Sequence, residues 1–392
     1  MTPPAAGGRD SRVLVLSQRN LHTSKSLTTQ FEFEDMLLDL DDVQLLAPGP
    51  APHADTGMMA RRIVNGGLQR AGLPRRSPPW TKPSMRPTPV EGEHDLFFMV
   101  VSDSNQLSFL ERLKGWRERS RTAVCLLLEV WSRQVPDNAD YYRILREFDA
   151  VYMLTPQSAP ALQALGAPPP VFLPVGVDAE RVSPLYRRPV PAARAIDVYA
   201  YGRTAPTLHQ QLLDLVDTEG LSYQYDTTFQ AKVPNHVEHR ALLANSLKRA
   251  KYHLAHRIND DPQRLHRTGG EESLSTRYFE ASASGAVMLG SRPRTPDFDA
   301  CFDWPDAVIE VPWDCDDVAG VLHDLGGQPD RLAAARSAGV RAALLRHDWA
   351  YRWERVLDDA GLSVPEQLHA RRARLQEQAA AVTPESLTRE SV

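Results

Sequence analysis

Cysteines and long apolar runs are both scarce in this sequence. Its 392 residues include only three cysteines, Cys125, Cys301 and Cys315, none in a Cys-x-x-Cys spacing. An odd and widely spaced set indicates neither a disulfide framework nor a zinc knuckle, and it favours a reducing compartment. The longest apolar runs, such as residues 123–128, are far shorter than the roughly 18 to 20 residues that span a bilayer. Residues 1–12 lack the apolar core of a secretory signal, so a soluble, cytoplasmic protein is expected.

An excess of positive charge is also absent. The formal net charge is -5 at pH 7 and the pI is near 6.2, so we expect no nucleic-acid partner. One segment departs from this balance, because residues 56–90 carry seven basic side chains, no acidic ones and many prolines. It is interpreted either as an exposed loop or as a surface for an anionic acceptor or lipid headgroups. At most peripheral membrane contact is expected.

The chain shows the alternation of strands and helices that is typical of doubly wound parallel sheets. Its length predicts two domains, at roughly 100 to 200 residues each. Short apolar runs alternate with helix-like stretches, pause at the Pro/Arg-rich residues 185–195, and then resume. The predicted segments are a disordered lead (1–11), a first Rossmann-like domain (12–184), a linker (185–195), a second Rossmann-like domain (196–362), and a tail (363–392) that is helical and disordered from 383.

The expected elements follow from the same alternation. Strands are predicted at 12–17, 43–46, 95–101, 122–128, 150–154 and 171–174 in the first domain, and at 196–201, 222–225, 252–255, 286–289 and 307–311 in the second. Helices are predicted at 108–118, 141–148, 158–165, 208–216, 238–249, 275–284, 318–325 and 330–345.

Residues 269–289 carry the most informative pattern of the chain. Two glycines and two acidic residues precede a serine-capped helix, which ends at Gly285 and is followed at once by a strand. The backbone N–H groups of Ser273, Leu274 and Ser275 are expected to lack partners within the helix, and with the helix dipole they form an anion site. A diphosphate suits such a site.

Two glutamates flank this helix start. Glu272 lies in the mouth of the loop, and Glu280 lies more than one helical turn further along. A carboxylate can accept two hydroxyl donors, as a sugar or a ribose diol offers. The pair therefore predicts contacts with a ligand that is rich in hydroxyl groups.

These residues resemble the C-terminal domain of GT-B glycosyltransferases of the retaining group-1 kind, and in particular the CgeB-like subgroup. The shared pattern is a Glu-x7-Glu element, here Glu272 to Glu280, inside a Ser/Leu…Arg-x-Phe-Glu-x-x-Ala-x-Gly run. The resemblance covers residues 174–362 well and the first 170 residues poorly. Three shorter elements belong to it: Gly176-Val-Asp178, Gly202-Arg203 and the His-x4-Arg-like stretch His347–Arg352.

The resemblance implies an α/β, GT-B-like fold, with two doubly wound Rossmann-like domains facing a central cleft. The second domain is expected to bind the nucleotide sugar and the first domain the acceptor. Glu280 is expected to accept from the ribose of the donor, Glu272 to act as the catalytic residue near the reacting carbon, and Arg203 to neutralise the leaving diphosphate. Ser273, Leu274, Ser275 and Arg277 complete the expected donor site.

The activity implied is that of a glycosyltransferase, an enzyme of EC class 2.4. It moves a sugar from a nucleoside-diphosphate sugar to an acceptor hydroxyl with retention of anomeric configuration. The acceptor is a small molecule, a glycan or a lipid-linked molecule, and no cofactor is required. Two alternatives stay open: a nucleotide-sugar 2-epimerase on the same scaffold, and a non-catalytic relic that binds sugar nucleotides or glycans.

The sequence departs from the family pattern at one position. The family often has a lysine five residues after the diphosphate-binding arginine, whereas this chain has Leu208. Arg277, Arg257 or Lys232 can substitute for the missing cation. Arg277 is also open to another interpretation, as an ion-pair partner of a neighbouring glutamate on its own helix.

No metal site is expected. About two Asp-x-Asp triplets arise by chance among 30 aspartates in 392 residues, so the triplets present carry no signal. Arginine side chains and a helix dipole can stabilise the leaving diphosphate without a metal. The three triplets are Asp39/Asp41, Asp297/Asp299 and Asp314/Asp316.

Acceptor-side residues are predicted from their places after strands of the first domain. Arg19 and His22 follow the first strand, Asp103 follows the strand at 95–101, and Glu129 follows the next. Any of them can line an acceptor pocket or help to remove a proton.

Two residues of the pattern are interpreted as structural. Gly176 is predicted to need a positive φ in a turn, and Asp178 to cap a helix or close an Asx-turn.

Overall fold

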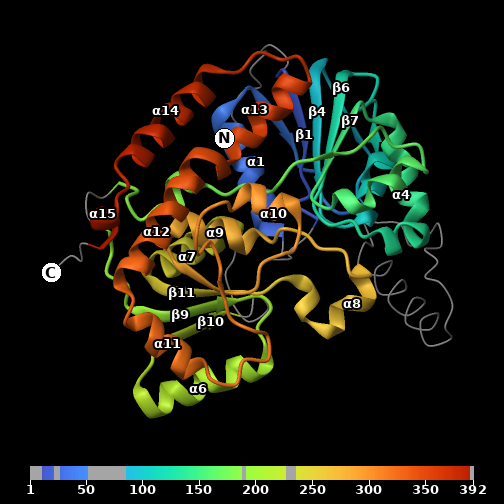
Figure 1. The fold of residues 1–392 in the computed structure, drawn as a ribbon. Coiled ribbons are helices and arrows are strands. Elements are labelled where there is room, and N and C mark those ends of the chain that lie inside the picture. Colours follow the sequence, from blue (N-terminus) through green and yellow to red (C-terminus); the bar gives the residue numbers. More distant parts are fainter. Residues whose placement is uncertain (1–10, 22–26, 52–84, 188–190, 227–234, 389–392) are drawn as a thin grey trace. The chain divides into compact units, whose positions relative to one another are not determined.

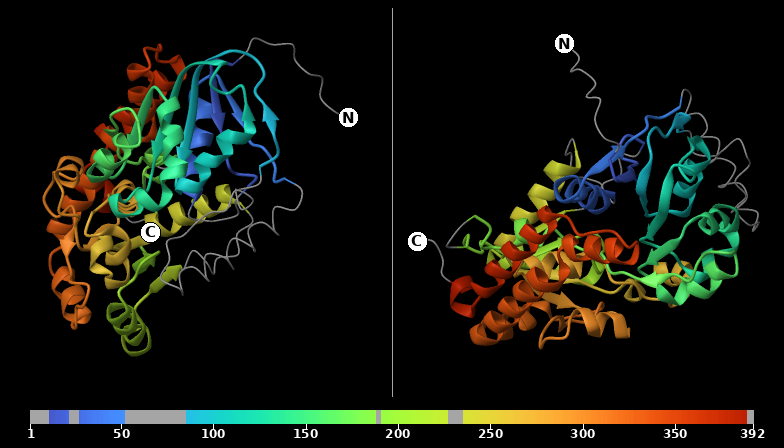
Figure 2. Two further views of the ribbon diagram at one scale, coloured as in Figure 1. Left: turned by 90° about the vertical axis from the view of Figure 1, so that its right-hand side faces the viewer. Right: turned by 90° about the horizontal axis from the view of Figure 1, so that it is seen from above.

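The computed structural model describes residues 11–21, 27–51, 85–187, 191–226 and 235–388. The chain divides into two units, one of residues 1–23 and 37–173 and one of residues 24–36 and 174–392. Each unit contains a parallel sheet with helices packed against it (Figures 1 and 2). The predicted α/β class with two parallel sheets is confirmed. The predicted lead and most of the basic segment 56–90 lie outside the described residues.

The first unit is built on six parallel strands in the order β2-β1-β4-β6-β7-β8. Val13 of β1 pairs with Val43 on one side and with Leu96 on the other, and all four residues of β1 are buried, as is typical of a strand in the centre of a covered parallel sheet. Its strands are β1 (Val13–Leu16), β2 (Val43–Leu46), β4 (His94–Val101), β6 (Ser120–Leu127), β7 (Ala150–Met153) and β8 (Val171–Phe172), and a separate parallel pair is β3 (Thr88–Pro89) with β5 (Leu113–Lys114).

Most connections after these strands are short 3-10 helices, where the sequence predicted α-helices. Asp103 and Gln106 form a capping box at the start of the first one, and Gly115 has a φ of +80° that turns the chain before residue 118. The predicted helix at 108–118 is therefore wrong in its second half. The connections are η3 (Ser104–Arg112), η4 (Ser132–Gln134), η5 (Pro136–Asn138), α3 (Ala139–Tyr142), η6 (Arg143–Glu147), η7 (Pro156–Ser158) and α4 (Ala159–Gln163).

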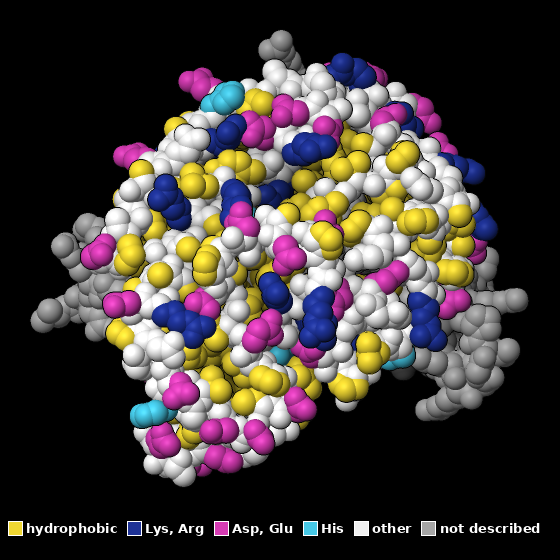
Figure 3. Space-filling model, in the orientation of Figure 1, with side chains coloured by type: hydrophobic (Ala, Val, Ile, Leu, Met, Phe, Trp, Pro, Cys, Tyr) yellow, Lys and Arg dark blue, Asp and Glu magenta, His cyan; other side chains and the backbone are white. Residues whose placement is uncertain are grey.

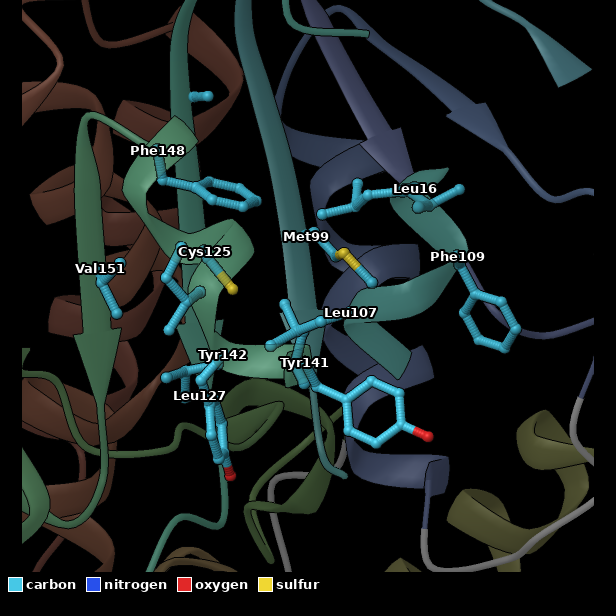
Figure 4. Close-up of a cluster of buried hydrophobic side chains, with 14 of the residues drawn as sticks. Leu16, Met99, Leu107, Phe109, Cys125, Leu127, Tyr141, Tyr142, Phe148 and Val151 are labelled. Atoms are coloured by element: carbon cyan, nitrogen blue, oxygen red, sulfur yellow. The ribbon is translucent and has the colours of Figure 1, made fainter. Parts of the chain in front are cut away.

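These connections cover one face of the sheet and form its apolar core. Figure 4 shows Met99 of β4 and Cys125 of β6 pointing toward side chains of η3 and α3, among them Leu107 and Tyr141. All four are buried. Burial in this core raises the pKa of the Cys125 thiol, so Cys125 behaves as a small apolar side chain.

Helix α1 (Thr28–Leu40) was not predicted. Its Phe-Glu-Phe-Glu start alternates apolar and acidic residues, which is the period of a strand. Both acidic positions, Glu32 and Glu34, are nevertheless buried. Residues 24–36 belong to the second unit, so long-range contacts of this segment override the local pattern.

The second unit is built on five parallel strands in the order β10-β9-β11-β12-β13. Val198 of β9 faces a core that includes Leu208 and Leu212 of α6, whereas Tyr199 faces Leu243 and Leu247 of α7. Figure 1 shows α6 on one side of these strands and α7 on the other. The strands are β9 (Ile196–Tyr201), β10 (Tyr223–Asp226), β11 (Ala250–Ala255), β12 (Val287–Gly290) and β13 (Ile309–Glu310).

The helices of the second unit agree with prediction at all five predicted places and in the helical tail, but α5, α8, α10, α13 and α15 were not among the predicted helices. Every predicted strand of both units is present, with ends that differ by at most two residues. The helices are α5 (Ala179–Val182), α6 (Pro206–Glu219), α7 (His236–Arg249), the 3-10 turn η8 (Ile258–Asp260), α8 (Pro262–Thr268), α9 (Thr276–Ser284), α10 (Pro296–Cys301), α11 (Val318–Gly326), α12 (Pro329–Ala342) with the π-helical turn η9 (Ala343–His347), α13 (Trp349–Asp359), α14 (Glu366–Ala380) and α15 (Pro384–Thr388).

Gly176 and Asp178 lie just before α5 and were both predicted to be structural residues. Asp178 is the N-cap of α5 and accepts from the Arg181 backbone N–H, as predicted. The prediction for Gly176 is wrong, because its φ is not among the positive values. A Cβ at Gly176 would lie 2.6 Å from the ring of Trp349, so the position needs glycine because an indole packs directly on its backbone.

The boundaries between the units differ from those predicted. The change of unit falls between residues 173 and 174, ahead of the predicted linker at 185–195. Within that stretch Arg194 donates to the Ala250 carbonyl at 2.6 Å and to the Ser284 carbonyl at 3.0 Å. This part of the chain is thus fixed to the second unit.

The C-terminal segment is also part of the second unit. Helix α15 lies in the stretch predicted to be disordered from 383, and its Leu387 is buried. Residues 389–392 lie outside the described part of the chain.

On the face seen in Figure 3, basic and acidic side chains are interspersed, and acidic ones gather over α6 at the bottom.

Arg371 anchors α14 to the rest of the second unit. It contacts Asp348 at 2.7 Å, Asp178 at 2.8 Å and Glu180 at 3.1 Å. Because Asp348 is fully buried, Arg371→Met leaves an uncompensated buried carboxylate and is expected to cost about 3 to 5 kcal/mol of unfolding free energy. Arg374→Met removes an exposed partner of Glu180 and is expected to cost less than about 1 kcal/mol. Urea denaturation measures both, and equal losses would contradict this account.

Candidate functional site

The second unit contains a pocket of about 590 Å³ beside the carboxyl end of β9. Parallel strands present their following loops at the same edge of a sheet, where ligands of such folds bind. Here the loop after β9 meets the start of α9, one face of α7 and the start of α8. The lining includes Tyr201, Gly202 and Arg203 after β9, His239 and Arg240 of α7, Ser275, Thr276, Arg277 and Glu280 at α9, Asp261 and Arg264 at α8, and Thr28, Thr29 and Trp313.

The start of α9 faces this pocket, but the helix begins one residue later than predicted. The helix begins at Thr276, and Ser275 is its N-cap, whose Oγ accepts from the Arg277 backbone N–H. Ser275 lines the pocket, whereas Ser273 and Leu274 do not, and Leu274 is buried. Ser273 and Leu274 thus precede the helix, and of the three residues predicted to form the anion site Ser275 is the one that caps it.

Arg203 and Arg277 form a pair of neighbouring guanidinium groups in the pocket wall. Arg277 donates to the carbonyls of Arg203 and His256, both at 3.1 Å, and to Ser275 Oγ at 3.3 Å. The Nε of Arg203 is buried without a partner. Within the described residues, neither guanidinium forms an ion pair with a carboxylate. Arg277 therefore does not form the ion pair with a neighbouring glutamate of its own helix that was the alternative interpretation.

The electrostatics of this pair favour an anion. Burial, followed by the charge of Arg277, lowers the pKa of Arg203 to about 10. Burial, followed by the same arginine, lowers the pKa of the adjacent His256 to about 4. His256 is thus neutral at pH 7, and the positive charge of this wall comes from arginines alone. A bound anion offsets the mutual repulsion of the two guanidiniums.

Glu280 lies in the same pocket wall and is almost completely buried. Its carboxylate accepts from the hydroxyl of Tyr201 and from Nη1 of Arg240, and 1% of the residue is exposed. Burial alone raises the pKa of Glu280, but Arg240 and the Tyr201 hydrogen bond outweigh it, so the net shift is downward. Glu280 is therefore an ionised acceptor.

Glu272 has different surroundings. It accepts from Arg257 Nη1 at 2.8 Å and from the backbone N–H of Arg294, and it is not part of the pocket lining. Arg257 also holds Asp260 at 2.7 Å, so it does not take the place of the missing lysine in the pocket. Glu272 lies in an adjoining polar cluster, together with Asn259.

The position of the missing lysine is Leu208, and the other two candidate cations are Arg277 and Lys232. Leu208 is fully buried in the core between α6 and the sheet, so that position offers no ligand here. Arg277 lies beside Arg203, and Lys232 is outside the described residues. Arg264, which the sequence reasoning missed, also lines the pocket.

Arg240 is another charged pocket residue that was not predicted. It occupies the same stripe of α7 as Leu243, Ala244 and Leu247, which are all buried. A charged residue on an apolar helical stripe is a recognisable signal of a buried ion pair. The sequence alone does not tell which carboxylates it meets.

The predicted acceptor-side residues all belong to the first unit. Arg19 donates to Ser17 Oγ at 3.1 Å, and Glu129 accepts from Trp131 Nε1 at 3.3 Å. Asp103 caps η3, which gives it a structural role. His22 is outside the described residues. An acceptor role for these residues stays a prediction.

Among the described residues, no group of three or more His, Cys, Asp or Glu side chains is arranged to hold a metal ion. Across the same part of the chain, no helix has both the length and the apolar character needed to cross a bilayer.

Residues 186–358 match a family described as glycosyl transferase-like. No curated protein matches the chain. Among solved structures, an alpha-glucosyltransferase in complex with UDP has a TM-score of 0.51 at 9% identity, covering 90% of this chain and 100% of that chain.

Two further structures give comparable coverage. An alpha-glucosyltransferase in complex with UDP-glucose and DNA containing an abasic site has a TM-score of 0.51 at 11% identity, covering 90% of this chain and 99% of that one. Anabaena HepE in complex with UDP-glucose has a TM-score of 0.46 at 10% identity, covering 95% and 100%.

At these identities the alpha-glucosyltransferase structures establish the fold, which is that of GT-B glycosyltransferases. The family match covers the pocket lining except Thr28 and Thr29. The chain thus has a GT-B fold, and its residues 186–358 are similar to a glycosyl transferase-like family.

Proposed function

We propose that the protein transfers a sugar from a UDP-sugar donor to an acceptor hydroxyl. The observation that carries this proposal is the pair Arg203 and Arg277, two guanidiniums in a pocket at the start of α9 that form no ion pair with a carboxylate of the described residues. Diphosphate is the anion that suits this wall, because guanidinium groups and a helix start both bind phosphate oxygens. The glycosyl transferase-like match over residues 186–358 supports the same class of donor.

The other end of the donor is assigned to the acidic side of the pocket. Glu280 accepts the ribose hydroxyls, and Glu272, in the adjoining cluster, meets the sugar near its reacting carbon. Of the possible nucleotides, UDP is proposed because the alpha-glucosyltransferase structures of the same fold hold UDP or UDP-glucose. Membership of the CgeB-like subgroup is proposed on the His347–Arg352 stretch.

The proposed reaction needs no nucleophile from the protein. The bond between the anomeric carbon and the diphosphate oxygen breaks while the acceptor oxygen bonds to the same carbon from the same face, which retains the configuration. The acceptor proton passes to the leaving phosphate oxygen. Arg203 and Arg277 stabilise the charge that develops on the diphosphate, so metal independence is proposed. The acceptor, a small molecule, a glycan or a lipid-linked molecule, is assigned to the first unit.

The arginine pair gives the most direct test. Arg203→Met and Arg277→Met each remove one charged hydrogen-bonding group, worth about 1.5 to 3 kcal/mol, so each is expected to weaken UDP binding roughly tenfold or more. Isothermal titration calorimetry measures the affinity, and thermal melts without nucleotide report any loss of folding. Arg292→Met, at an exposed ion pair of the same unit, is the control. Unchanged UDP affinity in both pocket variants would contradict the proposal.

The two glutamates are expected to separate by role. Glu280→Gln weakens UDP and the intact donor together, by roughly tenfold, because a charged acceptor of the ribose is lost. Glu272→Gln leaves UDP affinity nearly unchanged and lowers kcat, because its interaction is with a sugar that UDP lacks. Calorimetry with UDP beside initial rates with the UDP-sugar decides this. Loss of UDP binding in Glu272→Gln alone would reverse the roles.

Metal independence is tested separately. UDP affinity and sugar transfer are expected to be the same in EDTA as in Mg²⁺, because the arginines and the helix start carry the diphosphate charge. A panel of acceptors under both conditions measures transfer by product analysis. A strict divalent requirement for binding and turnover would disprove the metal-free mechanism, and donor turnover without any acceptor would favour the epimerase.

A further inference from the structure

A chain of buried charges leads from the pocket to helix α1. Arg240 of α7 contacts Glu280 through Nη1 and binds Glu32 with two bonds, Nε to Oε2 at 2.7 Å and Nη2 to Oε1 at 3.0 Å. The side chains of all three residues are at most 8% exposed. One guanidinium thus forms ion pairs with two carboxylates, and all three side chains are almost completely buried.

Glu32 is held from other directions as well. Its Oε1 accepts from the indole N–H of Trp349 at 3.1 Å and from the Asp178 backbone N–H at 3.2 Å. Glu32 therefore has little freedom to move, and it fixes the guanidinium of Arg240 in turn. The ring of Trp349 is itself stacked on Phe33 at 4.3 Å between centroids.

Stability alone is a poor explanation of this arrangement. Buried ion triads are often no more stabilising than apolar side chains of the same volume, because desolvation of the charges offsets their attraction. Here the triad borders the pocket, which Arg240 and Glu280 both line. Two carboxylates and one guanidinium also leave one net negative charge beside the pocket.

We infer that Glu32 and Arg240 are positioning residues, which hold the Glu280 carboxylate as a fixed and charged acceptor for the ribose of the nucleotide. The inference rests on the proposed function, in which Glu280 meets the ribose. Glu32 shares Arg240 with Glu280, so the charge of Glu280 is only partly neutralised. Without Glu32, the guanidinium neutralises Glu280 alone and makes it a weaker acceptor. Discrimination between ribose and 2′-deoxyribose therefore depends on Glu32.

The same two helices provide a matched control. Asp35 of α1 contacts His236 of α7 at 2.7 Å, which links α1 to α7 as the Glu32–Arg240 contact does. Within the described residues, the Glu280 carboxylate accepts hydrogen bonds from Tyr201 and Arg240, and neither Asp35 nor His236 is among its partners. A loss that comes merely from loosening α1 on α7 is expected in Asp35→Asn as well.

The test compares UDP with 2′-deoxy-UDP by calorimetry on four proteins: wild type, Glu32→Gln, Arg240→Lys and Asp35→Asn. Lysine keeps the charge of residue 240 but cannot bridge two carboxylates as a guanidinium does, so it serves if Glu32→Gln fails to fold. Wild type is expected to prefer UDP by roughly tenfold, as for a hydroxyl bonded to a charged group. Glu32→Gln and Arg240→Lys are expected to lose this preference while 2′-deoxy-UDP binds as before, and Asp35→Asn is expected to keep it.

Each contrary outcome has a distinct meaning. An unchanged preference in Glu32→Gln and Arg240→Lys, or equal loss in Asp35→Asn, overturns the positioning role and leaves the proposed function intact. A wild type that binds both nucleotides equally overturns the ribose contact on which the inference depends. A wild type that binds neither nucleotide overturns the proposed function itself.

Discussion

Arg240 is buried between the carboxylates of Glu32 and Glu280, and the second unit is organised around this guanidinium. An unpaired charge at such a place costs several kcal/mol, so α1, α7 and α9 must come together before any of the three charges is satisfied. This constraint explains why residues 24–36 belong to the second unit although the chain on both sides of them belongs to the first. The burial of Glu32 and Glu280 follows from the same contact.

The pocket wall contains charges of both signs. Among the described residues, Arg203 and Arg277 form no ion pair with a carboxylate, whereas Glu280 is an ionised acceptor whose pKa is lowered by Arg240 and Tyr201 against the effect of burial. A nucleoside diphosphate has the complementary pattern, with an anionic diphosphate beside a ribose that donates hydroxyl hydrogen bonds. The match between this polarity and the ligand is the physical basis of the proposed donor site.

Local sequence patterns predict much of this fold, and they fail where distant contacts decide. The strands at 43–46 and 196–201 agree to the residue, because each is a short apolar run in a regular alternation of strands and helices. Helix α1 was missed because its alternating start is stabilised by Arg240, a partner 208 residues away from Glu32. Arg203, Arg277 and Glu280, which the resemblance to GT-B glycosyltransferases indicated, line the pocket. Arg240 and Arg264 were not predicted, because the apolar stripe of α7 marks Arg240 as buried without telling which carboxylates it meets, and no motif marks Arg264.

The central claim is that the pocket beside the carboxyl end of β9 binds the nucleotide of a sugar donor. A crystal structure of the protein with UDP tests this most directly, because it locates each part of the ligand independently of activity. The account predicts diphosphate oxygens within hydrogen-bonding distance of Arg203 and Arg277, and a ribose hydroxyl on the Glu280 carboxylate. A nucleotide bound elsewhere on the molecule, or one in the pocket with its diphosphate away from both arginines, would contradict it.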